Sequence, residues 1–208
     1  MMKRQIASIT AALVALTTGL LQSEQINAAE LPSNGLVLWL DAADASSLKL
    51  TNGQVESWRN KAPGFQNQFK SGKDHYPRHL SAAESGVRPT LRFDGRDDVL
   101  ADGQFNRQMK TWTLAVVAAP FPSNTGGGLV TGCSAHGNDY DPGFTVDLFE
   151  TTSRFNSLSV EGAGRLAGQA NQLTASFLLG GLHVIVVERD QEEIRVRVDG
   201  GKQMTRPV

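Results

Sequence analysis

The most regular part of the sequence is LHVIVVERDQEEIRVRVDGG, residues 182–201. It contains a strongly apolar segment at 183–188 with the continuous run VIVV at its centre, the polar segment RDQEE, and then apolar and charged residues that alternate over 194–199. A continuous apolar run is typical of a buried strand, whereas strict alternation indicates a strand with one buried and one solvated face. The stretch therefore predicts an antiparallel β-hairpin, and its last three residues, Asp-Gly-Gly, predict a further turn.

Short apolar or alternating runs continue upstream of this hairpin, where Gly, Asn, Asp and Pro separate them. The strongest is TWTLAVVAA, residues 111–119, which ends at Pro120. The other predicted strands are residues 36–40, 54–59, 90–93, 99–101, 128–132, 144–149 and 156–160. Many short strands without long helical stripes predict an all-β domain built as a sandwich of two antiparallel sheets.

Two segments of the N-terminal half differ from this pattern of short apolar or alternating runs. Residues 60–88 are polar with scattered Gly, Pro, Lys and His, and we expect a long surface excursion with little regular structure. The stretch GLVLWLDAADASSL, residues 35–48, changes from apolar to polar within a few residues. We interpret Leu36–Leu40 as the first core strand and the segment from Asp41 to Asp44 as the turn that ends it.

The first 29 residues have the features of a secretory signal peptide. Lys3 and Arg4 give a positive start, residues 6–21 are mostly apolar, and small residues at Ala28 and Ala29 suit a cleavage site. The apolar run is short for a membrane-spanning helix, and Ser, Thr and Gly interrupt it. We therefore expect a mature domain, residues 30–208, that is secreted, periplasmic or at the cell surface and has no membrane segment.

Charge and cysteine content narrow the classes of partner. Removal of residues 1–29 lowers the number of basic residues from 20 to 18 and of acidic residues from 21 to 20, which leaves a formal charge of −2. This balance provides no basic footprint for nucleic acid or for an anionic membrane. Cys133 is the only cysteine, so no internal disulfide can form, and we expect it to be a small buried strand residue.

Several stretches resemble, in order along the chain, the LamG-like concanavalin A-type lectin/glucanase domains of large exported bacterial proteins. They are the stretches quoted above together with GQVESWRNKA, residues 53–62, and RPTLRFDGRDDVL, residues 88–100. The likeness extends from about Leu36 to Gly201. It implies a jelly-roll sandwich whose members mostly bind glycans or proteins through the concave sheet or the rim loops, often with calcium at the rim.

The resemblance also raises a question about the end of the fold. Domains of this family continue past the Asp-Gly hairpin with one or two closing strands, whereas only residues 202–208 follow it in this sequence. The sequence leaves open whether the closing strand is lacking, is donated by a partner, or belongs to a longer protein. An unpaired edge would invite strand addition or aggregation.

No predicted strand carries a pair of acids at the spacing of a glycosidase active site. Asp147 and Glu150 are three residues apart and so lie on opposite faces of a strand. Glu193 and Asp199 share a face but lie about 20 Å apart along it. A retaining glycosidase needs two carboxyl groups about 5–5.5 Å apart. We therefore expect no catalytic residue and no enzymatic activity.

The loop CSAHGNDYDPG, residues 133–143, is the strongest candidate for ligand contact. Its tyrosine could stack on a sugar ring and its asparagine could bond hydroxyl groups, although a solvated loop with Asx turns is the alternative. Calcium prefers several oxygen ligands, which aspartates and backbone carbonyls of this loop could supply. The candidate ligand-binding residues are His136, Asn138, Asp139 and Tyr140, and the candidate calcium ligands are Asp139 and Asp141.

A second group of acids, Asp94, Asp97 and Asp98, surrounds Gly95 in the segment DGRDD. Aspartate is favoured in tight turns because its side chain accepts hydrogen bonds from nearby backbone N–H groups. We therefore interpret the segment as a turn, with a calcium loop as the alternative.

The expected function is that of an exported, non-catalytic binding module that recognises a carbohydrate or a cell-surface protein. Calcium is a candidate cofactor, and nucleic acid and membranes are not expected partners. Two alternatives stay open: a structural or assembly module of a larger exported protein, and a polysaccharide hydrolase.

Overall fold

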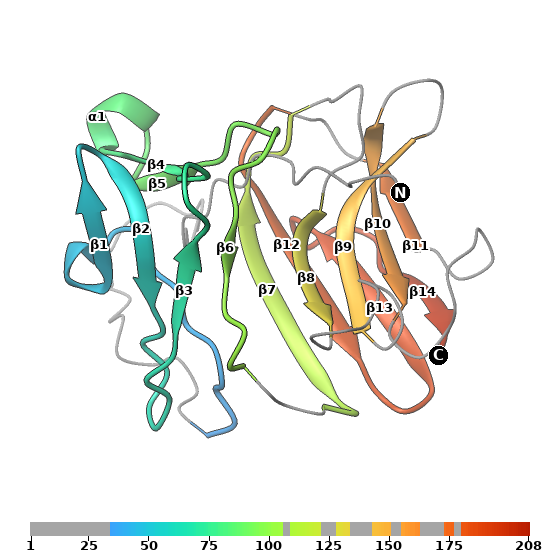
Figure 1. Cartoon of the computed structure of the whole chain (residues 1–208). Helices are drawn as coiled ribbons and strands as arrows, with labels where there is room; N and C mark the ends of the chain where they lie inside the picture. The colour runs from blue at the N-terminus through green and yellow to red at the C-terminus, as the bar shows by residue number, and fades with distance from the viewer. Residues whose placement is uncertain are drawn as a thin grey trace, which may run out of the picture.

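The computed structural model describes residues 34–105, 109–121, 128–133, 143–150, 155–162, 173–176 and 180–208. Within these residues the chain forms three antiparallel sheets, and two of them pack face to face as a β-sandwich (Figure 1). The predicted all-β sandwich is thereby confirmed. The third sheet, built from residues 48–101, contains the strands predicted at 54–59, 90–93 and 99–101, but the sequence did not predict that they form a separate sheet.

One layer of the sandwich contains the C-terminal hairpin. Its strands are β7 (Trp112–Ala118), β12 (His183–Arg189), β13 (Glu193–Val198) and β14 (Met204–Pro207), in the order β14-β13-β12-β7. Asp190 Oδ1 closes the hairpin turn by accepting hydrogen bonds from the N–H groups of Glu192 and Glu193, at 2.8 and 2.9 Å. The predicted hairpin is confirmed, and β14 is the strand that follows it.

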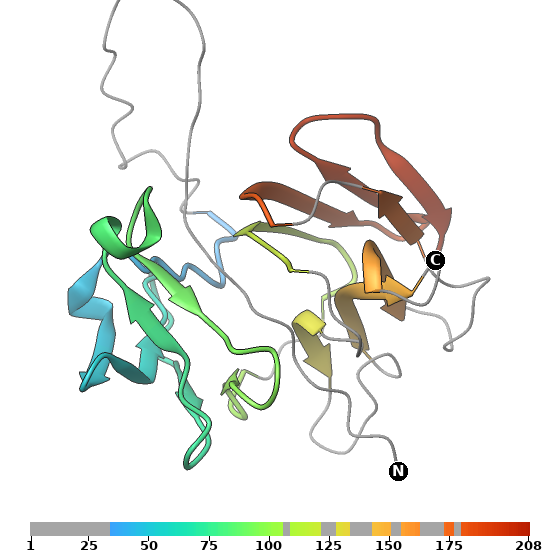
Figure 2. The same ribbon diagram turned by 90° about the horizontal axis from the view of Figure 1, so that it is seen from above.

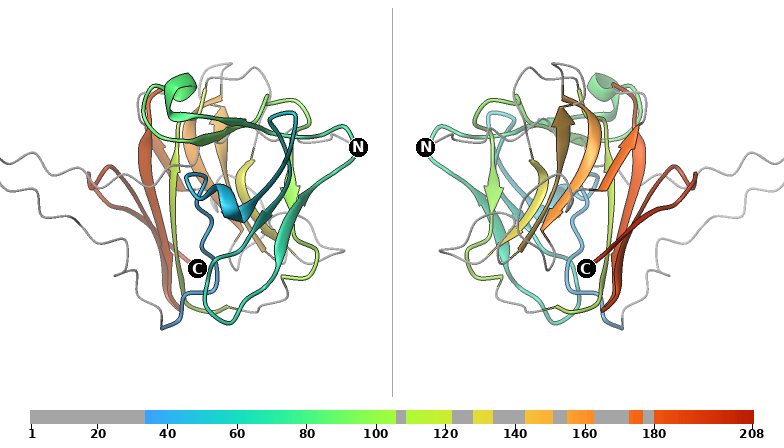
Figure 3. Two further views of the ribbon diagram at one scale, coloured as in Figure 1. Left: turned by 90° about the vertical axis from the view of Figure 1, so that its left-hand side faces the viewer. Right: turned by 90° about the vertical axis from the view of Figure 1, so that its right-hand side faces the viewer.

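The other layer consists of β8 (Gly128–Cys133), β9 (Gly143–Glu150), β10 (Phe155–Gly162) and β11 (Leu173–Ser176), in the order β11-β10-β9-β8. The two layers are seen edge-on in the right-hand view of Figure 3. Cys133 lies in a strand as predicted, but it is exposed because it ends β8, which is an edge strand. The prediction that Cys133 is buried is therefore wrong.

The sandwich core is made of apolar residues from both layers, none more than 2% exposed. They are Ala118, Leu129, Val146, Leu158, Val160, Ile185, Val187, Ile194 and Val196. Burial of a Val, Leu or Ile side chain stabilises a fold by about 1.5–3 kcal/mol. The alternation of buried and polar positions in β9, β10, β12 and β13 thus holds the two layers together without a disulfide.

Arg206 joins the two layers at the β14 edge. Its side chain is buried, with the residue only 7% exposed, and one Nη donates hydrogen bonds across the sandwich to the backbone oxygens of Gly162 and Val160, at 2.7 and 3.4 Å. In the sheet, Arg206 lies opposite the buried Ile194, so its side chain points into the sandwich. The last strand is therefore held by its own ladder and by a link to β10.

The third sheet contains six short strands and has a separate apolar core. The strands are β1 (Leu48–Thr51), β2 (Gln54–Arg59), β3 (Gln68–Ser71), β4 (Arg78–Leu80), β5 (Thr90–Arg92) and β6 (Leu100–Ala101). Their order is β5-β4-β2-β3-β6, with β1 also paired to β2. The buried residues of this core are Ala42, Val55, Trp58, Leu91 and Phe93. Figure 2 shows this sheet beside the sandwich rather than within it.

The prediction of a structureless excursion over residues 60–88 is wrong. The segment contains β3, β4 and α1 (Ala82–Ser85). A capping box between Ser81 and Glu84 starts α1, and Gly86, with φ of 79°, ends it. These strands are three or four residues long and mostly polar, so their sequences lack the apolar repeat on which strand prediction depends.

The predicted first strand, Leu36–Leu40, is also absent: the segment is half-buried and belongs to no sheet. Its backbone bonds to the side chain of Asn60 instead, which accepts from the N–H of Trp39 and donates to the oxygen of Val37, both at 2.9 Å. Because one buried amide satisfies these groups, no neighbouring strand is needed. The turn predicted at its end is confirmed, since Asp44 N–H donates to the oxygen of Asp41 at 3.2 Å.

Lys61 fixes this turn. Its Nζ lies 2.8 Å from a carboxylate oxygen of Asp44, 3.2 Å from one of Asp41, and 4.3 Å from the centre of the Trp39 ring. The Lys61 hydrogen bond, followed by one from Ser46, lowers the pKa of Asp44 to about 2. Asp41 and Asp44 in the stretch 35–48 are therefore structural, as the sequence indicated.

Candidate ligand-binding sites

The residues predicted to contact a ligand lie outside the described part of the chain. His136, Asn138, Asp139, Tyr140 and Asp141 all fall within residues 134–142, between β8 and β9. Their roles in ligand and calcium binding stay predictions.

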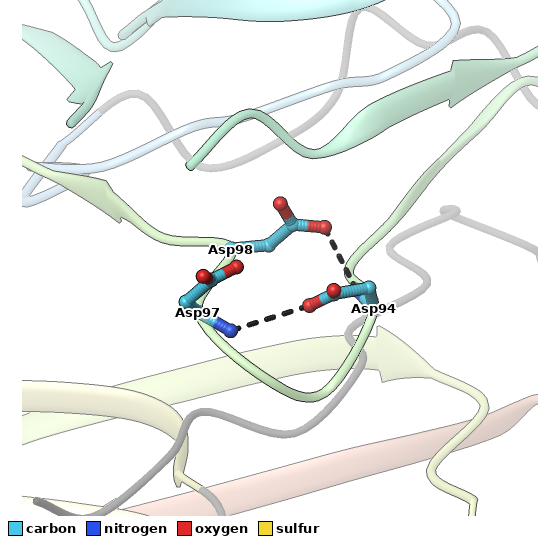
Figure 4. A group of neighbouring side chains, drawn as sticks. All are labelled: Asp94, Asp97 and Asp98. Carbon is cyan, nitrogen blue, oxygen red and sulfur yellow. Dashed lines mark hydrogen bonds between the residues drawn. The ribbon is translucent and has the colours of Figure 1, made fainter. Parts of the chain in front are cut away.

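The aspartates of the DGRDD segment form a compact cluster between β5 and β6 (Figure 4). Carboxylate oxygens of Asp94, Asp97 and Asp98 lie within 4.8 Å of one another. Asp94 Oδ1 accepts from the N–H groups of Arg96 and Asp97, at 2.8 and 3.3 Å, and Asp98 Oδ2 accepts from the N–H of Asp94 at 2.8 Å. These bonds confirm the predicted turn.

The three carboxyls differ in their environment. Asp98 is only 8% exposed, and burial, followed by the charges of Asp94 and Asp97, raises its pKa above the ordinary value. Burial also acts on Asp94, but the backbone N–H donors of the turn outweigh it and lower the Asp94 pKa. His75 lies at the side of the cluster, with Nδ1 3.3 Å from an oxygen of Asp97.

This arrangement could hold a metal ion. Three converging carboxylate oxygens concentrate negative charge, and a bound cation would relieve the repulsion that Asp97 and Asp94 exert on the buried Asp98. The hydrogen bonds of the turn use only some of the carboxylate oxygens. The cluster can therefore form the turn and still offer oxygen lone pairs to a cation.

A second polar group occupies the face of the β8–β11 sheet that points away from the sandwich core. We call Thr131, Thr145, Asp147, Ser159 and Glu161 the polar face. Strand register puts Thr131 and Glu161 on either side of Thr145, and Asp147 directly opposite Ser159. These two rows lie about 7 Å apart, since they are separated by two residues along each strand. The opposite face of the same strands carries the apolar residues of the sandwich core.

The polar face is exposed at the edge strand β8 and buried in β9 and β10. Thr131 is exposed in the edge strand β8, whereas the other four members are between 0 and 9% exposed. Thr131 and Thr145 hydroxyls lie 3.3 Å apart. The hydroxyl of Ser159 is fully buried and, among the described residues and their contacts, makes no hydrogen bond. A buried hydroxyl without a partner is costly, so Ser159 marks a position at which a hydrogen-bonding ligand would be favoured.

Sequence reasoning missed Ser159 and Glu161. The runs FTVDL and LSVEG both alternate, so the polar character of one face of each strand was readable. Their register was not, and only the register brings Asp147 and Glu161 to diagonal positions on neighbouring strands, with Cα atoms about 7–8 Å apart. Because Asp147 and Glu161 lie on different strands, the spacing of acids within one strand does not reveal this pair.

The two acid pairs considered from sequence have different outcomes. Asp147 and Glu150 both belong to β9, and the opposite orientation of their side chains stays a prediction. The prediction that Glu193 and Asp199 share a strand face is wrong, because β13 ends at Val198 and Asp199 begins a turn with φ of 52°. The Asp199 carboxylate instead accepts from the N–H of Val184 at 2.8 Å and contacts His183 Nδ1 at 2.6 Å.

No family model, curated protein or solved structure matches this chain. Among the described residues, no helix combines the length and the apolar character required to cross a membrane. The fold and the two polar groups are therefore the basis for assigning a function.

Proposed function

We propose that this protein is an exported, non-catalytic module that binds a glycan through the polar face. The observation that carries the proposal is the pair of polar rows on a sheet face, which ends in the unpartnered hydroxyl of Ser159. The resemblance to LamG-like domains supports the same assignment, because such domains mostly bind through a sheet or its rim.

The chemistry of the polar face suits a carbohydrate. Hydroxyl groups of Thr131, Thr145 and Ser159 can both donate and accept, and the carboxylates of Asp147 and Glu161 accept strongly. A glycan presents many hydroxyl groups that need partners of both kinds. The exposed Thr131 at the edge strand offers a point of approach, from which the rows continue inward.

Binding of the full chain to a panel of polysaccharides by affinity electrophoresis, followed by calorimetry with oligosaccharides, tests the proposal. Thr145→Val and Ser159→Ala each remove one hydroxyl with little change of shape. Each should weaken binding about 2- to 12-fold, the equivalent of one hydrogen bond of 0.5–1.5 kcal/mol.

Thr90→Val is the matched control. Thr90 is fully buried in β5 of the third sheet, and its hydroxyl is likewise unpartnered, but it is not part of the polar face. Its replacement should leave glycan affinity unchanged. A folded protein that binds no member of the panel, or equal losses in Thr90→Val and Ser159→Ala, would count against the proposal.

The non-catalytic part of the proposal has a separate test. Release of reducing sugar from the same panel should stay at the level of the blank. Steady release that disappears in Asp147→Asn or Glu161→Gln would instead make the diagonal acid pair a hydrolytic site.

For the aspartate cluster, we propose calcium as the ion. All three side chains offer oxygen, which calcium takes in sets of six to eight, whereas zinc sites are built from sulfur and nitrogen ligands. Terbium luminescence displaced by calcium would show the site, and zinc should compete poorly.

Export is tested at the N-terminus. If residues 1–29 are a signal peptide, the protein recovered outside the cytoplasm should begin at Glu30. Recovery only of the uncleaved chain in the cytoplasm would contradict export.

A further inference from the structure

Strands β3 and β6 lie side by side in the third sheet (Figure 1). A groove of about 320 Å³ lies where they meet, on the solvent face of this sheet. One wall is made by Gln66, Asn67, Gln68 and Lys70, and the other by the segment Ala101–Gln104. Lys70 and Ala101 are opposite each other in the ladder, so both walls belong to one face. The other face of β3 carries Phe69, which packs against the core of the third sheet.

The floor of the groove is held by a chain of side-chain amides. Asn60, only 2% exposed, donates to Asn67 Oδ1 at 2.8 Å, and Asn67 in turn donates to a carboxylate oxygen of Asp102. The other oxygen of Asp102 accepts from the N–H of Gln104 at 2.9 Å. These bonds fix the positions of both walls before any ligand arrives, which lowers the entropic cost of binding.

The side chains that remain available to a ligand are mostly neutral amides. Gln66, Gln68 and Gln104 are exposed, and each carries a donor and an acceptor that can meet two adjacent hydroxyls. The described lining contains one lysine and one aspartate, whose charges balance, and its one apolar side chain is that of Ala101. We propose that this groove is a second binding site, separate from the polar face, for a neutral saccharide.

A neutral saccharide fits this chemistry better than the other polar ligands. A peptide would need apolar pockets for alternate side chains, which the lining does not provide. An anionic ligand would meet the single Lys70 beside the carboxylate of Asp102, and among the described residues of the lining no arginine is present to bind it in bidentate fashion. With a few amide contacts and no stacking ring, we expect a Kd on the order of 1 mM.

The side-chain amide signals of glutamine report on this site directly. In ¹H–¹⁵N spectra of the full chain, we would titrate neutral glucose oligosaccharides with β-1,3, β-1,4 and α-1,4 linkages, together with an oligouronate and an uncharged peptide. The expected result is a saturable shift of the Gln66, Gln68 and Gln104 side-chain NH₂ signals with at least one neutral oligosaccharide, and no such shift with the other two probes.

Two variants locate the binding. A Cβ at Gly103 would meet no atom within 4 Å, so Gly103→Tyr can fill the groove without disturbing the fold, and it should abolish the shifts. Gln68→Ala should weaken binding several-fold, whereas Gln54→Ala, an exposed glutamine in β2 outside the groove, should not.

The outcomes separate this inference from the proposed function. Absence of these shifts with every neutral oligosaccharide at about 20 mM, well above the expected Kd, overturns the second site, as does their persistence in Gly103→Tyr. Binding that is lost in Ser159→Ala and intact in Gly103→Tyr would leave the polar face as the only site. Binding with the reverse pattern would retain the groove and reject the polar face.

Discussion

Replacement of Ser159 by alanine should not destabilise the protein, although Ser159 is fully buried in the middle of a strand. The usual expectation for a buried polar residue is the opposite, because its hydrogen bonds are lost. Ser159 makes none among the described residues, so the substitution removes a desolvated hydroxyl and no bond. The wild-type protein therefore carries a cost at this position that alanine does not.

The magnitude follows from two opposing effects. An unsatisfied buried hydroxyl costs about 1–3 kcal/mol. Loss of one oxygen leaves a void of about 10 Å³, and at about 24 cal/mol per Å³ this offsets only about 0.2 kcal/mol. We expect the free energy of unfolding to rise by about 1 kcal/mol, which corresponds to about 2–4 °C in Tm for a chain of this size.

Ser47→Ala is the matched comparison. Ser47 is also buried, at 3% exposure, but its hydroxyl donates to the backbone oxygen of Asp44 at 2.7 Å. The same chemical change should therefore lower the free energy of unfolding by about 1 kcal/mol. Urea denaturation of both variants and the wild type should give opposite shifts of the midpoint with unchanged m-values.

The reasoning is refuted if Ser159→Ala loses 1 kcal/mol or more, as Ser47→Ala does. That result would mean that the Ser159 hydroxyl has a structural partner in solution. It would also remove the observation on which the proposed glycan site depends.

Three further predictions concern charged groups. The Asp44 carboxyl has a folded pKa of about 2 against 3.8 unfolded, so its contribution is complete above about pH 5 and is lost as the pH falls toward 2. The full pKa shift corresponds to about 2.4 kcal/mol of stability, which partial exposure reduces to about 1 kcal/mol. Lys61→Met should remove this contribution of Asp44 to the pH dependence of stability, measured by urea denaturation between pH 2 and 7. Parallel curves for the wild type and Lys61→Met would contradict the prediction. Asp98→Asn keeps an acceptor for the Asp94 N–H but removes a carboxylate whose pKa is raised by burial. The affinity for terbium or calcium should fall at least about tenfold, while the stability of the metal-free protein at pH 7 is equal or higher. A loss of stability with unchanged metal affinity would assign the carboxylate to the turn alone. Arg206→Ala removes the guanidinium that donates to the Gly162 oxygen in a buried site and should lower the free energy of unfolding by about 2–4 kcal/mol in urea denaturation, with Arg206→Lys intermediate. Equal stabilities would show that the link between the layers does not stabilise the fold.

The sandwich was predictable because the pattern of apolar and polar residues in its strands indicates which face is buried. In β12 and β13, apolar residues such as Ile185, Val187 and Val196 recur at the spacing that buries one side of a strand, and hairpin pairing is local. Thr90–Arg92 and the DGRDD turn were found for similar local reasons. Such features require no knowledge of distant neighbours.

The predictions that were wrong or missed concern structures that depend on contacts with residues far away in the sequence. Leu36–Leu40 has the composition of a core strand, yet a single side chain, Asn60, takes the place of a neighbouring strand. Short polar strands such as β3 exist because Phe69 lies opposite Trp58 in the ladder, which no local pattern reveals. The same holds for the polar face, whose rows exist only once β9 and β10 are in register.

The pairing of β7 with β12 has a consequence for how the protein is made. Ala118 and His183 are neighbours in the sheet, so everything between these two positions must be synthesised before the strand TWTLAVVA can find its partner. Until then β7 is an uncharged, apolar segment with both edges unsatisfied, the kind that associates with other chains. Contacts so far apart in the sequence also slow folding. If the chain is exported as proposed, this interval falls during transit, when residues 111–118 would be open to association with other chains.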